Sequence, residues 1–175
     1  MEIRAHEIDS HEAAAGLLDR TLDLAVVRQT APTRGTTATT LLTDRFVAAL
    51  PAGHPAAATS EPIDLATLAG DTWIWLNRQI SPDYHDAMAA LCRAAGFSPI
   101  PAHWARSVTS QIAMVDCGLG VTVVPSTAVT PHHSARFRAL RDDAATIGLA
   151  ILTHDRPDEG VSRFTALITD VARRR

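Results

Sequence analysis

The chain has 175 residues, of which 46% are hydrophobic and 20% are charged, as expected for a globular protein of one or two small domains. Its formal net charge of −3 disfavours direct binding to nucleic acid, which requires a basic surface. No apolar run approaches the roughly 20 residues needed to span a bilayer, and the N-terminus has no apolar core typical of a signal peptide. The cysteines Cys92 and Cys117 form no disulfide framework. We therefore expect a cytoplasmic protein with no membrane partner.

The beginning of the chain predicts a strand–helix–strand unit. Residues 2–8 read as a strand, and Ser10 is placed to cap a helix over about 11–20. The nearly continuous apolar run 22–28 predicts a strand that is covered on both faces, as in a parallel sheet. A polar loop over 29–40 follows.

The rest of the chain alternates between strand and helix patterns. Further strands are predicted at 41–51, 71–76, 100–106, 120–124 and 147–153. Further helices are predicted around 63–69 and at 82–95, 107–117 and 161–171. The helix at 82–95 has clear ends, because Ser81 and Pro82 favour its start and Gly96 its stop. This alternation predicts an α/β fold.

The stretch VDCGLGVTVVP, at 115–125, contains two glycines that a phosphate-binding loop would also contain. Such a loop runs from a strand through glycines into a helix, so that the first N–H groups of the helix point at the anion. Here the helix comes first, Gly118 ends it, and Gly120 leads into a strand. Because a helix presents carbonyl groups at this end, the glycine pair is predicted to be structural.

Four segments together resemble the effector-binding domain of LysR-type transcriptional regulators. They are GLLDRTLDLAVVR, LPAGHPAA, LCRAAGFSPIP and VDCGLGVTVVP, in family order and at family spacing. The resemblance implies a periplasmic-binding-protein-like fold, with two Rossmann-like α/β subdomains and a ligand cleft between them. It implies a first subdomain made of 1–44 and 139–175, and a second subdomain, 45–138, inserted into the first.

The chain also departs from that family. A winged helix and a linker helix are absent from the predicted elements, and the chain begins at what corresponds to the second strand of the first subdomain. We therefore expect a truncated chain whose first subdomain lacks its first strand and helix. The sheet edge left open would favour a homo-oligomer through the first subdomains. DNA would be bound only through the missing N-terminal domain.

The resemblance also implies a small-molecule effector. The side chains that would bind it are hydrogen-bond donors, which favour a carboxylate or another anion. The candidate effector-binding residues are Ser10, Arg28, Asn77, Arg78, Ser107 and Thr109. Ser10 suits a carboxylate at a helix start, or is a cap and nothing more. Arg28 can clamp a carboxylate with two hydrogen bonds, or is a solvated strand end. The other four follow a strand that faces the cleft in the family, or begin the helix opposite.

Other chemistry is not predicted. His132 and His133 lack the spacing for two ligands on one helical face, and no acidic or cysteine partner is nearby in sequence, so we expect no metal site and no cofactor. Trp73 and Trp75 share a strand face and either pack in the core or wall the cleft. No nucleophile and base set stands out, so an enzyme is not expected. The alternative is a stand-alone solute-binding protein or a small enzyme on a similar bilobed scaffold.

The charge balance generates a first prediction. At a net charge of −3 the chain by itself should not bind duplex DNA at physiological salt, because few phosphate counterions would be released. An electrophoretic mobility-shift assay checks this, with a basic winged-helix protein as positive control. A shifted duplex at nanomolar protein would contradict it.

Overall fold

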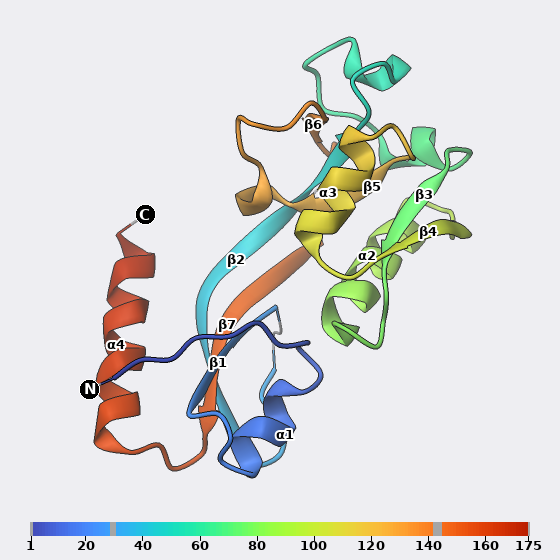
Figure 1. Ribbon diagram of the computed structural model, residues 1–175. Coiled ribbons are helices and arrows are strands. Elements are labelled where there is room, and N and C mark those ends of the chain that lie inside the picture. The colour runs from blue at the N-terminus through green and yellow to red at the C-terminus, as the bar shows by residue number, and fades with distance from the viewer. Residues whose placement is uncertain (1, 29–30, 142–144, 175) are drawn as a thin grey trace. The chain divides into compact units, whose positions relative to one another are not determined.

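The computed structural model describes residues 2–28, 31–141 and 145–174, and it confirms the α/β architecture (Figure 1). The chain divides into two compact units. Unit 1 comprises Met1–Thr43, Gln79–Asp83 and Gly148–Arg175, and unit 2 comprises Asp44–Arg78 and Tyr84–Ile147. Strands β2 (Thr36–Leu50) and β7 (Thr146–His154) each contribute residues to both units. Among the described residues, no helix has the length and apolar character that a bilayer crossing requires.

Unit 1 contains α1 (Ala13–Leu18), β1 (Leu24–Val27), α4 (Glu159–Arg173) and its parts of β2 and β7. Strand β1 pairs antiparallel with β7, with Leu24 opposite Thr153 and Val27 opposite Ala150. The strand order β1-β7-β2 leaves β1 at the edge of the sheet. The small core of this unit consists of Ala13, Leu17, Ala25, Val27 and Leu152.

Two predictions for the start of unit 1 are wrong. Residues 2–8 form no β-bridge and are not a strand. Ser10 does not cap α1, which begins at Ala13 with Glu12 at the N-cap and no side-chain capping bond. A turn separates Ser10 from the helix, since the Glu12 N–H donates to the Asp9 carbonyl at 3.0 Å. The hydroxyl of Ser10 is therefore too early in the chain to reach the second or third helical N–H.

Unit 2 holds the parallel strands β3 (Trp73–Leu76) and β4 (Pro101–Ala105), in which Leu76 lies opposite Ala105. Its part of β2 pairs antiparallel with both β5 (Thr122–Pro125) and β6 (Arg136–Ala139). The helices are α2 (Pro82–Ala94), whose first two residues belong to unit 1, and α3 (Val108–Asp116). The described residues of the unit also form three short 3-10 helices: η1 (Pro55–Ala57), η2 (Leu65–Leu68) and η3 (Ser126–Ala128).

Buried hydrogen bonds tie the helices of unit 2 to its strands. The Tyr84 hydroxyl, on α2, lies 3.2 Å from Gln111 Oε1, on α3, and 3.1 Å from the Val123 carbonyl. The Gln111 amide donates to Thr122 Oγ1 at 2.9 Å, and that hydroxyl donates to the Ile74 carbonyl at 2.8 Å. Because these polar atoms are shielded from water, each bond left unmade would cost about 1–3 kcal/mol.

The two tryptophans of β3 belong to the hydrophobic core of unit 2. Of the two alternatives, packing in the core or forming a wall of the cleft, the structure shows core packing. Trp73 and Trp75 are 1% and 3% exposed, and their rings meet edge to face at 5.7 Å between centroids. The Trp73 indole N–H donates to the Leu68 carbonyl at 2.9 Å, so its polar atom is satisfied inside the core.

The glycine pair is structural, as predicted. Helix α3 ends at Asp116, and Gly118 follows with a positive φ of 77°. At Gly120 the backbone passes so close to Thr72 that a Cβ would lie 2.2 Å from the Thr72 carbonyl oxygen. That approach lets the Val121 N–H donate to the same oxygen at 2.8 Å.

This close approach predicts that Gly120→Ala lowers the free energy of unfolding by about 1–3 kcal/mol, since the added methyl group would push β5 away from Thr72. Urea denaturation followed by circular dichroism measures the change. Gly70→Ala is the matched control, because a Cβ at Gly70 meets no atom within 4 Å. Equal stabilities for the two variants would contradict the steric argument.

Candidate functional site

The carboxyl ends of three strands of unit 2 point to one edge, which we call the carboxyl edge. Strands β3 and β4 are parallel, and Val121, just before β5, forms a parallel bridge with Trp73. In open α/β sheets, small ligands bind outside the carboxyl ends of the strands, where loops and helix N-termini converge. The carboxyl edge is therefore the candidate site within unit 2.

Polar residues follow each of these three strands. They are Asn77 and Arg78 after β3, Ser107 and Thr109 after β4, and Ser126 and Thr127 after β5. The first four were predicted from the sequence, and the backbone joins their two loops, since the Asn77 N–H donates to the Ala105 carbonyl at 3.3 Å. Ser126 and Thr127 were missed. Their signal was the same one, polar residues directly after a buried apolar strand.

Ser107 works as a helix cap. Its hydroxyl accepts from the Ser110 N–H at 3.1 Å, while the Ser110 hydroxyl accepts from the Ser107 N–H at 2.9 Å. This reciprocal pair fixes the start of α3 at the carboxyl edge, where Thr109 is exposed. The positive end of the α3 dipole is thus directed to the edge, which favours a negatively charged group there.

Arg78 is held by an acidic neighbour. Its guanidinium donates to both carboxylate oxygens of Asp86, on α2, at 2.9 and 2.8 Å. These bonds, together with one from His85, lower the pKa of Asp86 to about 2. The two side chains are 62% and 52% exposed, so the pair adds little stability. A ligand that used Arg78 would have to compete with the Asp86 carboxylate.

Asp44 anchors the loop after β5. The residue is 3% exposed, and its carboxylate accepts hydrogen bonds from the Ser126 hydroxyl at 2.5 Å, the Thr127 N–H at 3.2 Å and the Thr127 hydroxyl. Charge-assisted bonds of this kind are stronger than bonds between neutral groups. The negative charge of Asp44 is therefore compensated by donors from the polar loop that completes the carboxyl edge.

The other two candidates belong to unit 1. Ser10 lies half-buried in the turn before α1, and Arg28 lies half-buried directly after β1. Ser10 is not a helix cap, so the alternative that it is only a cap is wrong. Contact of all six candidates with an effector stays a prediction.

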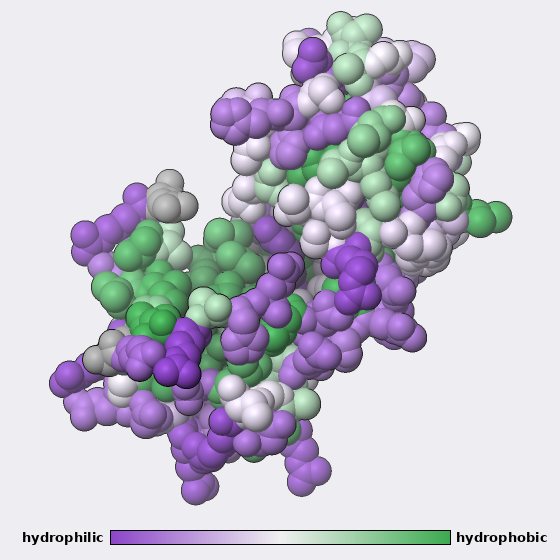
Figure 2. All heavy atoms as spheres, in the orientation of Figure 1, coloured by the Kyte–Doolittle hydropathy of each residue, from purple (hydrophilic) through white to green (hydrophobic). Residues whose placement is uncertain are grey.

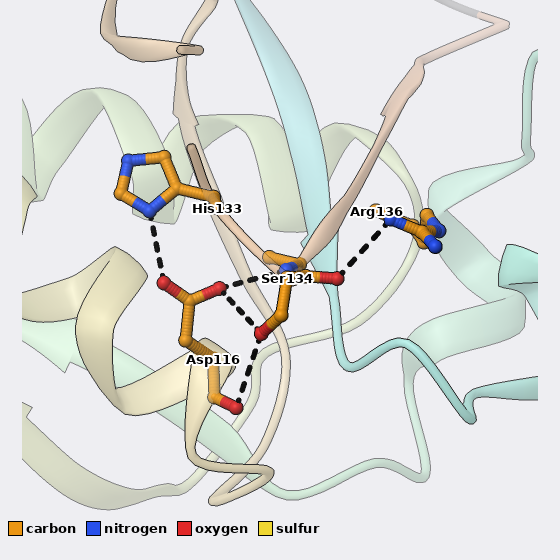
Figure 3. Close-up of polar contacts among 5 residues, drawn as sticks. Asp116, His133, Ser134 and Arg136 are labelled. Carbon is orange, nitrogen blue, oxygen red and sulfur yellow. Dashed lines mark hydrogen bonds and ion pairs between the residues drawn. The ribbon is translucent and has the colours of Figure 1, made fainter. Parts of the chain in front are cut away.

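A serine, a histidine and an aspartate meet at the end of α3 (Figure 3). Asp116 Oδ2 lies 2.9 Å from His133 Nδ1, and Asp116 Oδ1 accepts from the Ser134 hydroxyl at 3.0 Å and the Ala135 N–H at 2.7 Å. The partner of His133 is 17 residues away in sequence, which is why sequence reasoning found none.

The cluster lacks the arrangement of a hydrolytic triad. In a triad the histidine lies between the serine and the carboxylate, and takes the serine proton. Here the carboxylate binds both side chains, and the Ser134 hydroxyl donates to Asp116. The cluster instead fixes the chain that leads into β6. No group of three or more metal-binding side chains occurs in the part of the chain that is described.

Comparisons with known proteins agree on one family. The model of the LysR substrate binding domain matches residues 1–173. The HTH-type transcriptional regulator CatR of Pseudomonas putida is 29% identical over 174 residues, which are 98% of this chain and 60% of that protein. A probable hydrogen peroxide-inducible genes activator of Mycobacterium avium is 28% identical over 177 residues, 98% of this chain and 56% of that protein. The chain thus spans 60% or less of the length of these two regulators.

Solved structures share the fold. The C-terminal domain of a probable LysR family regulator from Rhodococcus sp. RHA1 has a TM-score of 0.79 at 22% identity, covering 93% of this chain and 82% of that one. The BenM effector-binding domain with its effector benzoate has a TM-score of 0.77 at 16% identity, covering 95% of this chain and 76% of that one. The predicted bilobed, periplasmic-binding-protein-like fold class is confirmed by these neighbours.

The Asp116 cluster generates a pH-dependent prediction. Burial raises the pKa of Asp116, but the bonds from Ala135, His133 and Ser134 outweigh it and hold the pKa below 3.8. A lowered pKa in the folded state stabilises the protein above the unfolded pKa, and this stabilisation is lost as the pH falls through the folded value. We expect Asp116→Asn to cost roughly 1–3 kcal/mol at pH 7, and the difference to shrink below about pH 4.

Urea denaturation of both proteins at pH 7, 4.5 and 3 measures that difference. Asp170→Asn is the control, because Asp170 is exposed on α4 and pairs with Arg174 at the surface, so its loss should cost about 0.5 kcal/mol or less. A pH-independent difference for Asp116→Asn would show that the ionised carboxylate does not anchor the loop.

Proposed function

This chain belongs to the family of LysR substrate-binding domains, and from that premise we propose that it senses a small-molecule effector for a transcriptional regulator. The observation that carries the proposal is the family match over residues 1–173, together with a fold shared with solved effector-binding domains. The regulator's contact with DNA would come from another part of the protein, because the net charge of these residues is −3.

We propose that units 1 and 2 correspond to the two subdomains expected from the sequence, 1–44 with 139–175 and 45–138. An effector can shift the balance between two arrangements of the subdomains only by the difference in its affinity for them. Contacts from both subdomains would be one source of such a difference. The carboxyl edge would supply the contacts from the second subdomain, and Arg28 and Ser10 those from the first.

We also propose that the effector is an anion, most simply a small carboxylate. The α3 N-terminus at the carboxyl edge favours negative charge, and Thr109 is an exposed hydroxyl beside it. The carboxylates nearby are already bound, Asp44 by Ser126 and Thr127, and Asp86 by Arg78. BenM, which shares the fold, was solved with the carboxylate benzoate.

A thermal-shift screen followed by calorimetry tests the function. Benzoate, benzamide and benzylamine form a matched anionic, neutral and cationic set, to be extended to other small carboxylates. A ligand at 100 times its Kd should stabilise the protein by about 2.7 kcal/mol. A best ligand that is cationic would contradict the proposed ligand class, and no stabilisation by any small molecule would contradict the sensing function.

Arg28→Ala should weaken the best carboxylate by about tenfold or more, because a bidentate, charge-assisted contact contributes roughly 1.5–3 kcal/mol. Arg163→Ala is the control, since Arg163 is an exposed arginine on α4 that pairs with Glu159. Equal affinities for the two variants, with folding verified by circular dichroism, would remove Arg28 from the site.

A further inference from the structure

The loop after β5 brings two hydroxyl groups to the carboxyl edge of unit 2. Ser126 and Thr127 directly follow Pro125, the last residue of β5, and both are exposed. Hydrophilic side chains also cover this edge over the loop that leads from β4 to α3 (Figure 2). A small molecule at the carboxyl edge can therefore reach Ser126.

The pairing of β2 with β5 brings a carboxylate to these hydroxyls. In the antiparallel register Phe46 lies opposite Pro125, so the next positions along the two strands place Asp44 beside Thr127. Asp44 accepts the Ser126 hydroxyl at 2.5 Å, together with the N–H and the hydroxyl of Thr127. Because Asp44 is only 3% exposed, these donors stand in for water around its charge.

The bond to Asp44 decides what Ser126 can offer to another molecule. A serine hydroxyl has one proton to donate and two lone pairs that accept. The Ser126 proton is directed to Asp44, so its oxygen meets any other partner with lone pairs. Turning that proton away would leave a buried carboxylate with one donor fewer, which is unfavourable. The exposed side of Ser126 is thus a hydrogen-bond acceptor.

An anionic group is a poor partner for this oxygen. A carboxylate carries only acceptors, and close to Ser126 it would also be repelled by the charge of Asp44. A hydroxyl or an amino group, in contrast, supplies the proton that Ser126 accepts. The loop after β5 therefore favours a donor, whereas the loop after β4 favours negative charge.

One small molecule can reach both loops. Strand β3 lies between the other two, since it pairs with β4 and the Ile74 N–H donates to the Val121 carbonyl, just before β5, at 2.9 Å (Figure 1). Neighbouring strands are about 4.8 Å apart, so the ends of β4 and β5 are separated by roughly 10 Å. A ligand with a negative group at one end and a donor at the other fits this arrangement.

We propose that Ser126 determines the specificity of the effector site by accepting a hydrogen bond from the effector. The effector is then a hydroxycarboxylate or an aminocarboxylate, and not a carboxylate without a donor. This inference rests on the proposed function, an anionic effector, and adds the group at its other end. Asp44 is a positioning residue, because it orients the Ser126 hydroxyl without touching the effector.

Calorimetry with benzoate and with the ortho, meta and para isomers of hydroxybenzoate and methoxybenzoate tests the proposal, since methylation removes the donor proton and keeps the oxygen. We expect at least one hydroxybenzoate to bind about fivefold or more tightly than its methoxy counterpart. Ser126→Ala should reduce this ratio to about two or less. Ser98→Ala is the matched control and should leave it unchanged, because Ser98 is exposed before the opposite end of β4.

Asp44→Asn should also lower the ratio, because an amide both donates and accepts and so releases the Ser126 proton for other partners. Ser126→Ala, at an exposed position, keeps the test independent of how well the buried substitution folds. A ratio that came from the bulk of the methyl group would persist in Ser126→Ala.

The proposal is overturned if no hydroxybenzoate binds more tightly than its methoxy counterpart, or if Ser126→Ala keeps the ratio of the unsubstituted protein. Binding of benzoate in either case would leave the sensing function standing. Failure of every small carboxylate to bind would instead contradict the proposed function itself.

Discussion

The hydrogen-bonded chain from Tyr84 through Gln111 and Thr122 to the Ile74 carbonyl is the constraint on which unit 2 depends. It links α2, α3, β5 and β3 through atoms that have no access to water, so none of these elements can shift without leaving a buried polar group unpaired. An apolar core alone tolerates small slides between its elements. This chain of bonds fixes α3, through Gln111, relative to Thr122 at the beginning of β5 and Ile74 in β3.

The polar side chains at the carboxyl edge are largely occupied by each other. Ser107 caps α3, Arg78 binds Asp86, and Asp44 binds the loop at Ser126. A preformed site of this kind orders few side chains when a ligand binds, which lowers the entropic cost of binding. If the proposed effector is an anion, the backbone N–H groups at the start of α3 and the exposed hydroxyl of Thr109 would be partners for it, because they oppose no existing ion pair.

The two units differ in how completely each is packed. Unit 2 surrounds Trp73, Tyr84 and Met88 with further buried side chains and closes its sheet with β6. Unit 1 has a core of five small and aliphatic side chains, an edge strand and a helix with no buried residue. Since a small core supplies little stability, unit 1 draws less of its stability from apolar packing than unit 2.

The sequence by itself determined the α/β class, the family, the glycine turn at Gly118 and Gly120, and the placement of Asn77 and Ser107 after neighbouring strands. These features follow from local patterns, namely strand and helix periodicity, helix caps and the order of glycines relative to a helix. Tertiary structure alone decided that residues 2–8 are not a strand, since a strand exists only where another pairs with it, and that α1 begins three residues after Ser10. It also decided that Asp116 meets His133 and that Arg78 is bound by Asp86, because these contacts join residues whose proximity depends on how the elements pack.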